Sequence, residues 1–177
     1  MLREDQKKWL SHLSDTNIVK VIPYDPNAKV RFQNFKTELQ HVLGKDVTIV
    51  HRGASSLGIS GQGELDIYVP VPPSMFDTAL EQLTIAFGEP GSVSAINRAR
   101  FNIKREGGKI EIHLVNQDAQ VWKENTIFFN YLQTHPDALS KYEQLKEHAS
   151  GASTREYYRR KIEFINEILT QALSKRS

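Results

Sequence analysis

The chain has 177 residues, of which 39% are hydrophobic and 25% charged, and its formal net charge is +2. This composition is typical of one globular domain, residues 1–177, and not of a disordered chain. The small net charge argues against DNA and anionic membranes as partners. The absence of cysteine excludes disulfides, thiol catalysis and zinc sites with cysteine ligands.

The sequence predicts neither export nor membrane insertion. Its first residues, MLREDQKKWLSHL, carry acidic side chains and no long apolar run, so we expect no signal peptide. No apolar run approaches the ~18 residues of a membrane-spanning helix. Together with the absence of cysteine, these features lead us to expect a cytoplasmic protein.

The first quarter of the chain predicts a helix, a strand and a second helix. Leu2–Leu13 can form a short helix, and Ile18–Pro23 is a short strand that ends at a proline. A longer helix is expected to start at Pro26 and to end at Gly44, a plausible C-cap. Its apolar face carries, at helical spacing, Val30, Phe32, Phe35, Leu39, Val42 and Leu43.

Two strands follow, separated by a turn rich in Gly and Ser. Val47–His51 is a run of β-branched residues typical of a strand, and residues 52–63 form the turn. Hydrophobic and polar residues alternate in Glu64–Val71, which predicts a strand with one buried face. The buried face carries Leu65, Ile67 and Val69, and the opposite face carries Glu64, Asp66 and Tyr68.

A helix and a β-hairpin come next. Ser74 is expected to cap the helix, whose inward side chains are Phe76, Leu80, Leu83 and Phe87. Ile96–Lys104 and Lys109–Val115 flank Glu106-Gly107-Gly108, a pattern typical of a hairpin. In the second arm, one face carries Ile110, Ile112 and Leu114, and the other carries Glu111 and His113.

The remainder, about residues 118–177, is predicted to be helical, with helices over Val121–Thr134, Pro136–His148 and Thr154–Lys175. Strands and helices are therefore mixed in the first two-thirds, and a helical tail follows. This order predicts an α+β fold with a mixed or antiparallel sheet, flanking helices and a helical C-terminal portion.

Three groups of residues are candidates for chemistry. In Gly53-Ala54-Ser55-Ser56, small residues after a strand allow backbone N–H groups and the hydroxyls of Ser55 and Ser56 to approach a phosphate. Glu64 and Asp66 stand two residues apart on one strand face, where their oxygens can hold Mg²⁺ against a substrate phosphate. The same patterns also occur in ordinary turns and in solvent-facing strands.

The hairpin supplies the third group. If its second arm neighbours Glu64–Val71, then Glu111 or His113 completes a site with Asp66, and His113 is a candidate general base. Arg100 and Lys104 alternate to one face, as does Arg98, and can clamp a triphosphate. The final helix places Tyr157 and Lys161 on one face. Each of these features has a plain structural alternative, a hydrogen-bonded histidine or a solvated face.

The order of the elements is more informative than any one of them. A strand, a Gly/Ser turn, a short helix, a carboxylate strand and a further carboxylate strand form the layout that metal-assisted nucleotidyl transfer needs. The turn would hold the β- and γ-phosphates. The carboxylates would hold one or two metal ions.

With these motifs in place, the sequence resembles the GrpB family of the nucleotidyltransferase-like superfamily, from about Val19 to Leu169. The family's H-x-G-S-T-S-V-P-G-L segment corresponds to His51–Ile59, and its strand starting with Asp corresponds to Leu65-Asp66-Ile67. Its F-R-D-Y-L-R-x-H-P segment is similar to Phe128–Pro136, followed by Tyr142-x-x-Leu145-Lys146. Its Y-x-x-x-K-x-x-F-I tail is similar to the segment from Tyr157 to Ile165.

The sequence departs from the family pattern near the expected site. Ala54 replaces a serine, and Gln62-Gly63 stands where Lys-Pro is common. The loop is about one residue short at Gly58. Tyr68 stands where a second aspartate would complete an Asp-x-Asp pair, unless Glu64 substitutes from the other side.

The resemblance implies a nucleotidyltransferase-like fold and leaves three interpretations open. The first is a Mg²⁺-dependent enzyme that transfers NMP from an NTP to an unknown small-molecule or protein acceptor, with long RNA disfavoured by the net charge. Its metal ligands would be Asp66, Glu64 and Glu111, and Lys161 would reach in from the tail. The second is a non-catalytic nucleotide-binding or interaction module on the same fold. The third is a structural protein with a vestigial pocket.

Overall fold

The computed structural model of the chain describes residues 1–95, 97–105 and 107–174. The described chain divides into two compact units. A sheet unit comprises Tyr24–Gly58 and Gly63–Lys123, and a helical unit comprises Met1–Pro23, Ile59–Gln62 and the segment from Glu124 to the C-terminal end. That the 177 residues form one domain stays a prediction.

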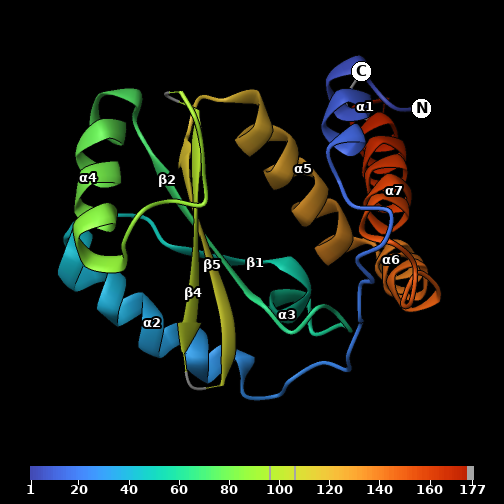
Figure 1. Cartoon of the computed structure of the whole chain (residues 1–177), viewed down its shortest axis with the longest axis horizontal. Helices are drawn as coiled ribbons and strands as arrows, with labels where there is room; N and C mark the ends of the chain where they lie inside the picture. The colour runs from blue at the N-terminus through green and yellow to red at the C-terminus, as the bar shows by residue number, and fades with distance from the viewer. Residues whose placement is uncertain (96, 106, 175–177) are drawn as a thin grey trace. The chain divides into compact units, whose positions relative to one another are not determined.

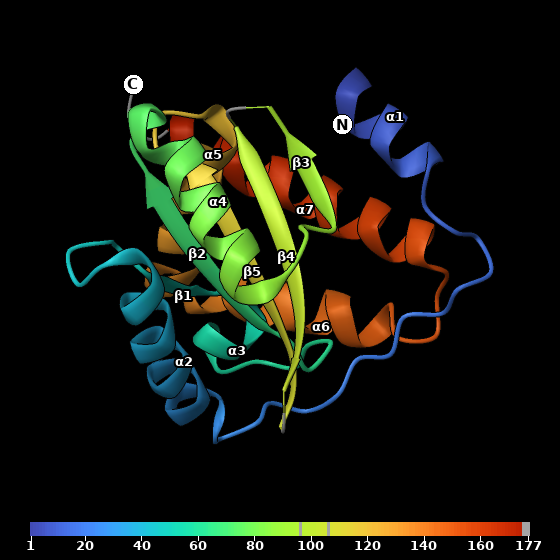
Figure 2. The same ribbon diagram turned by 60° about the vertical axis from the view of Figure 1, so that its left-hand side comes forward.

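The sheet unit contains a five-stranded mixed sheet in the order β1-β2-β5-β4-β3 (Figures 1 and 2). The strands are β1 (Val50–Arg52), β2 (Leu65–Val71), β3 (Ser92–Ser94), β4 (Arg98–Arg105) and β5 (Gly108–Asn116). β2 and β5 are parallel, and the other neighbouring strands are antiparallel. The predicted α+β class with a mixed sheet is confirmed.

Alternating side chains give this sheet one apolar face. The exposed fraction is 0% for Leu65, Ile67 and Val69 of β2, whereas Asp66 and Tyr68 between them are only half-buried. In the parallel register of β2 and β5, Leu65 pairs with Ile110, Ile67 with Ile112 and Val69 with Leu114. Two apolar rows therefore share one face, and the polar rows share the other.

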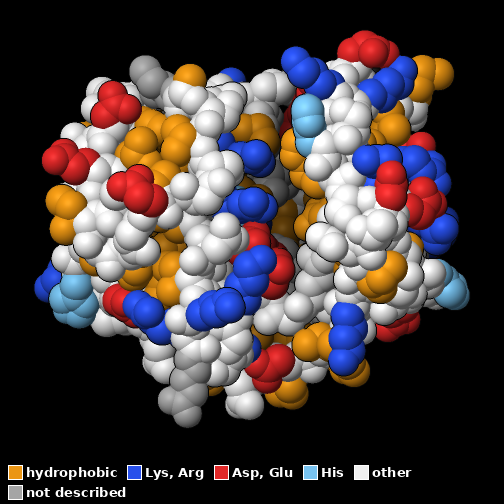
Figure 3. Space-filling model, in the orientation of Figure 1, with side chains coloured by type: hydrophobic (Ala, Val, Ile, Leu, Met, Phe, Trp, Pro, Cys, Tyr) orange, Lys and Arg blue, Asp and Glu red, His pale blue; other side chains and the backbone are white. Residues whose placement is uncertain are grey.

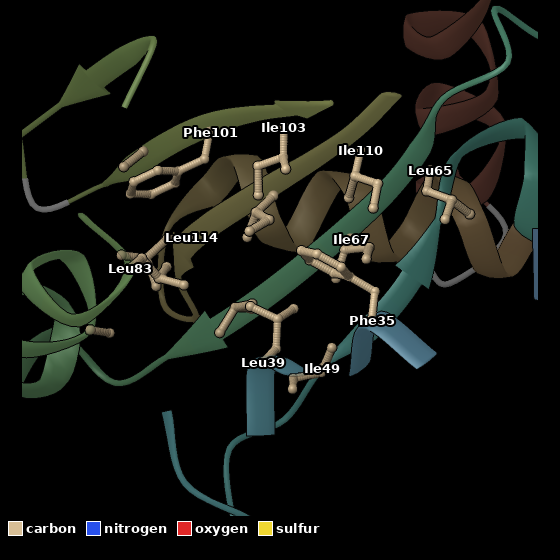
Figure 4. Packing of buried hydrophobic residues seen from close by; sticks show 14 of the residues in the cluster. Phe35, Leu39, Ile49, Leu65, Ile67, Leu83, Phe101, Ile103, Ile110 and Leu114 are labelled. Carbon is tan, nitrogen blue, oxygen red and sulfur yellow. The ribbon is translucent and has the colours of Figure 1, made fainter. Parts of the chain in front are cut away.

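Two helices cover the apolar face, α2 (Ala28–Leu43) and α4 (Phe76–Phe87) (Figures 1 and 2). Phe35 and Leu39 of α2 and Leu83 of α4 are buried against the sheet (Figure 4). Two short helices complete the unit, α3 (Gly53–Leu57) after β1 and the 3-10 turn η1 (Pro73–Met75) before α4. The face that carries Asp66 lies opposite this core.

The helical unit contains α1 (Glu4–Ser11), α6 (Pro136–His148), α7 (Thr154–Ser174) and most of α5 (Gln120–Thr134). Helices α1 and α6 both pack against α7. The rings of Phe128, Tyr142 and Phe164 form an aromatic cluster, with Tyr142 and Phe164 stacked 5.4 Å apart. Aromatic pairs of this kind add to the apolar burial that holds the helices together.

Most predicted elements are present, and the exceptions have physical causes. Within the described residues, Ile18–Pro23 forms two isolated bridges, from Ile18 to Ser153 and from Ile22 to Gly61, so the predicted strand is wrong. Its backbone groups pair with loops of the helical unit one residue at a time. The strand predicted at Val47–His51 begins only at Val50, because the chain reaches its partner β2 there.

Three further predictions need correction. Val30 is 60% exposed and does not belong to the buried face of α2. Ser74 lies inside η1, so it does not cap α4, whose N-terminal boundary residue is Met75. β3 was not predicted, since its sequence Ser-Val-Ser is short and all three of its residues are exposed. Ile96, Glu106 and Lys175, at predicted boundaries, lie outside the described residues.

No helix in the described part of the chain is both long enough and apolar enough to cross a membrane.

The two sides of α2 provide a test of this packing. Phe35→Ala should lower the free energy of unfolding by about 3–5 kcal/mol, because it leaves a cavity where the ring was buried. Val30→Ala, on the exposed side of the same helix, should change it by less than about 0.5 kcal/mol. Urea denaturation followed by circular dichroism measures both. Equal effects of the two substitutions would contradict the assignment of faces.

Candidate functional site

Asp66, Glu111 and His113 converge on the polar face of the sheet. Asp66 lies beside Glu111 in the parallel register of β2 and β5, and His113 follows two residues later on the same face. The imidazole Nε2 lies 3.6 Å from Asp66 Oδ1 and 3.6 Å from Glu111 Oε2. One ligand atom from each of the three side chains lies within 4.8 Å of the other two. The condition on which the sequence analysis joined Glu111 or His113 to Asp66, that the two strands are neighbours, is therefore met.

Burial and neighbouring charges shift the pKa values of Glu111 and His113. The side chains of Glu111 and His113 are 10% and 9% exposed. Burial alone would raise the pKa of Glu111, but contacts with His113 and Lys109 outweigh it and lower that pKa to about 2. Burial alone would lower the pKa of His113, but the contacts with Asp66 and Glu111 outweigh it and raise that pKa. His113 and Glu111 thus favour the charged forms.

Lys109 is a site residue that the sequence reasoning missed. Its ammonium donates to Glu111 Oε1 at 2.6 Å and to Glu64 Oε1 at 3.0 Å. Burial and repulsion from Glu111 raise the pKa of Glu64, despite the hydrogen bond from Lys109. The alternation of β5 could have indicated this residue, because 109, 111 and 113 share one strand face.

Glu64, Asp66 and Glu111 were the predicted metal ligands. The structure brings Asp66 and Glu111 together with His113, while the Glu64 carboxylate accepts a hydrogen bond from Lys109. Glu64 precedes β2 and is not among the three residues whose ligand atoms converge. The metal-binding roles themselves stay predictions.

Gly53 lies directly against the Asp66 carboxylate. Its φ of +74° is in the left-handed region, which favours glycine. A Cβ atom at this position would lie 1.9 Å from Asp66 Oδ2 and 2.7 Å from Asp66 Cγ, far closer than non-bonded atoms approach. Only glycine can therefore occupy position 53 while Asp66 keeps its place.

Ser55 and Ser56 lie on α3, beside β1. The Ser55 hydroxyl lies 2.9 Å from His51 Nε2 and donates to the Glu64 carbonyl at 3.3 Å. Ser56 donates to the Gly53 carbonyl at 2.9 Å. The His51 ring stacks on Phe32, with centroids 4.6 Å apart. Burial lowers the pKa of His51 to about 4, although the nearby Asp66 carboxylate acts to raise it.

Tyr68 occupies the next outward position on β2 after Asp66. Its ring stacks on His113 with centroids 4.4 Å apart and an interplanar angle of 18°. Its ring centroid also lies 5.7 Å from that of Trp122, over which the Arg52 guanidinium lies at 5.4 Å. The position of the missing second aspartate is thus filled by an aromatic ring that covers one face of the imidazole.

Basic side chains of β4 lie on the same face of the sheet. Arg100 pairs with His113 and Lys104 pairs with Lys109, so these side chains point to the side of the carboxylates. Figure 3 shows Lys and Arg side chains in a column along β4 and β5 with acidic side chains beside them. Arg100 Nε is buried and has no hydrogen-bond partner among the described residues.

The last predicted site residue, Lys161, belongs to the helical unit. It lies on α7 with its Nζ 5.4 Å from the ring centroid of Tyr158. Its predicted contact with a nucleotide stays a prediction. The other nine predicted residues all belong to the sheet unit: Gly53, Ser55, Ser56, Glu64, Asp66, Arg100, Lys104, Glu111 and His113.

The mixed sheet and its flanking helices form a nucleotidyltransferase-like fold. The crystal structure of the conserved protein GrpB from Enterococcus faecalis matches 88% of this chain and 98% of its own, with a TM-score of 0.70 and 23% sequence identity. A chain in the structure of the GLD-2/RNP-8 complex is similar over 90% of this chain and 62% of its own length, with a TM-score of 0.54 and 14% identity.

Sequence comparison gives the family. The family described as GrpB protein matches residues 18–171. A UPF0157 protein from Vibrio cholerae is 26% identical over 155 residues, which cover 86% of this chain and 81% of that protein. The chain belongs to the GrpB family, as its motifs predicted.

The contact between Gly53 and Asp66 can be tested with a matched pair of glycines. Gly53→Ala should displace the Asp66 carboxylate and destabilise the fold by more than about 1 kcal/mol. Gly58→Ala, at a φ of +71° with open space around the new Cβ, carries a similar backbone cost without the collision. Thermal unfolding measures stability, and chemical shifts of the Asp66 side chain report its displacement. Indistinguishable effects of the two substitutions would contradict the contact.

His51 should titrate with a midpoint near pH 4, well below the ordinary histidine value of 6.5. A histidine with a lowered pKa in the folded state takes up protons more readily when unfolded, so its contribution to stability is lost as the pH falls from about 6.5 towards 4. NMR of the ring carbons measures the midpoint, with His51→Gln to assign the signal. A midpoint near 6.5 would show that the ring is not desolvated.

Proposed function

We propose that this protein is a metal-dependent nucleotidyltransferase that transfers NMP from an NTP to a small-molecule or protein hydroxyl. The proposal rests above all on the convergence of Asp66, Glu111 and His113 within one polar cluster. The nucleotidyltransferase-like fold supports it, and so does Arg100 on the same face of the sheet, whose buried Nε has no hydrogen-bond partner among the described residues. From the sequence, Mg²⁺ is the expected cation.

The residues of the cluster fit a divalent cation. Two carboxylate oxygens and one imidazole nitrogen lie within 4.8 Å of one another, and the nitrogen lies 3.6 Å from one oxygen of each carboxylate. Both kinds of donor bind divalent cations. Asp66 and Glu111 would hold it, with His113 beside them. When bound, such an ion neutralises charge on the α-phosphate and favours ionisation of the acceptor hydroxyl.

The remaining residues of the sheet unit bind and orient the substrate in this proposal. The backbone at Gly53, beside Asp66, and the hydroxyl of Ser55, beside His51, would contact phosphate oxygens. Arg100 and Lys104 neutralise the triphosphate from β4, and the unpartnered Arg100 Nε gains an acceptor.

The reaction balances as a simple displacement. The acceptor oxygen forms a bond to the α-phosphorus while the bond from that phosphorus to the bridging oxygen of pyrophosphate breaks. The hydroxyl proton passes to the Asp66 carboxylate, the most exposed of the three convergent groups, with 26% of its side chain accessible. Pyrophosphate then leaves, and the NMP stays on the acceptor.

Asp66→Asn provides the test. The substitution keeps the side-chain shape but removes the charge, so the rate of transfer from an α-labelled NTP should fall by at least about a hundredfold. Calorimetric titration of ATP with and without Mg²⁺ should show that the variant loses metal-dependent binding. Asp46→Asn, an exposed position in the loop after α2, serves as the matched control and should leave both measurements unchanged.

Two results would overturn this proposal. Equal metal-dependent binding by wild type and Asp66→Asn would remove Asp66 from the metal site. Nucleotide binding by the wild type without label transfer to any small-molecule or protein acceptor would instead favour a non-catalytic nucleotide-binding module.

A further inference from the structure

In each carboxylate of the cluster, one oxygen contacts a neighbour and the other is directed at His113. Asp66 Oδ2 lies against Gly53, and Asp66 Oδ1 lies 3.6 Å from His113 Nε2. Glu111 Oε1 accepts a hydrogen bond from Lys109, and Glu111 Oε2 lies 3.6 Å from the same nitrogen. Asp66 Oδ1 and Glu111 Oε2 therefore both face His113 Nε2.

The imidazole is oriented so that only its Nε2 faces the two carboxylate oxygens. His113 is 7% exposed, and its ring lies flat on Tyr68. Its other nitrogen, Nδ1, is buried and has no hydrogen-bond partner among the described residues. The ring thus has one directed polar contact, with the two carboxylates.

The two distances from Nε2 to the carboxylate oxygens suit direct coordination. Two ligand atoms about 2.1 Å from one ion, at angles of about 90–120°, lie about 3.0–3.6 Å apart. The distances of 3.6 Å from Nε2 to Asp66 Oδ1 and Glu111 Oε2 lie at the upper end of that range. Lys109 holds the far oxygen of Glu111, as a hydrogen-bonded group behind a metal ligand commonly does.

From this donor set we infer that the centre selects a first-row transition-metal dication over Mg²⁺, with His113 Nε2 as a direct ligand once the incoming ion has displaced its proton to solvent. The inference rests on the proposed function and names the ion of its metal centre. Mg²⁺ prefers an octahedral shell of oxygen atoms and keeps several waters, so an imidazole in a buried set of three donors disfavours it. Transition-metal dications accept imidazole nitrogen together with carboxylate oxygen.

Mn²⁺ is the strictest probe of this inference. Among first-row dications it binds nitrogen donors most weakly, and its preference for carboxylate ligands is most like that of Mg²⁺. A preference for Mn²⁺ over Mg²⁺ therefore implies a stronger preference for the later ions. Mn²⁺ also reports a bound nitrogen through the electron-spin-echo spectrum.

The experiment uses the full chain after treatment with a chelator. Mn²⁺ should bind to the wild type at one site, at least about tenfold more tightly than Mg²⁺ in competition. The echo spectrum of the Mn²⁺ complex should show modulation from a directly bound imidazole nitrogen. His113→Gln should lose that modulation and bind Mn²⁺ about tenfold more weakly, while its Mg²⁺ affinity changes by less than about threefold.

His41→Gln is the matched control, since it removes an exposed imidazole from the last turn of α2. It should keep the modulation and the preference for Mn²⁺. If His113→Gln does not fold, as circular dichroism will show, the wild-type echo spectrum decides the question alone.

Equal affinities for Mn²⁺ and Mg²⁺, or a Mn²⁺ complex without nitrogen modulation, would overturn this inference and leave the proposed metal-dependent enzyme intact. A wild type that binds neither ion, with or without nucleotide, would overturn both. If the wild type binds Mn²⁺ tightly and His113→Gln leaves that affinity unchanged, the ion lies elsewhere. This result would also overturn the inference.

Discussion

The parallel pairing of β2 with β5 is the contact on which the candidate site depends. The chain passes through α4, β3 and β4 before β5 returns beside β2, and only this return brings Asp66 next to Glu111. The register is fixed from the other face of the sheet, where two apolar rows pack under α2 and α4. A slip of one residue would exchange the faces of β5 and bury Glu111 and His113 in the core. Hydrophobic packing on one side therefore sets the geometry of the polar cluster on the other.

The cluster is tolerated on a sheet face because its charges nearly balance. Burying an isolated carboxylate costs several kcal/mol, and three acids lie close together at Glu64, Asp66 and Glu111. Lys109 and His113 offset most of that charge through contacts of 2.6–3.6 Å. The balance leaves one negative charge when both cations are protonated and all three acids are ionised. The direction of the pKa shifts of Glu111 and His113 reflects the mutual attraction between these acids and the two cations.

Sequence patterns predicted the local structure well and the tertiary contacts less well. The alternation in β2 and β5 placed Asp66, Glu111 and His113 on outward faces, because side-chain direction in a strand follows position alone. Their convergence depended on the pairing of β2 with β5, and no local sequence pattern shows which strands are neighbours. Lys109 was missed because a lysine on an exposed face has no local signature of its partners. Ile18–Pro23 has the residues of a strand, yet its backbone partners are single residues in distant loops, which a local pattern does not reveal.

The geometry around Asp66 separates the position that must keep the family's residue from the positions at which this chain departs from the family pattern. At position 53 any side chain would collide with Asp66, whereas the neighbouring position 54 accommodates the Cβ of Ala54 in a half-buried turn of α3. Tyr68, in place of a second aspartate, gives the imidazole of His113 a flat surface to stack on. An aspartate there would remove that surface and add a carboxylate beside Asp66 and Glu111. The aromatic residue and the histidine therefore belong to one arrangement, in which an oriented imidazole takes the place of a further acid. In the centre that we propose, mixed oxygen and nitrogen donors would hold the ion, and the chemistry of these donors decides which ion is preferred.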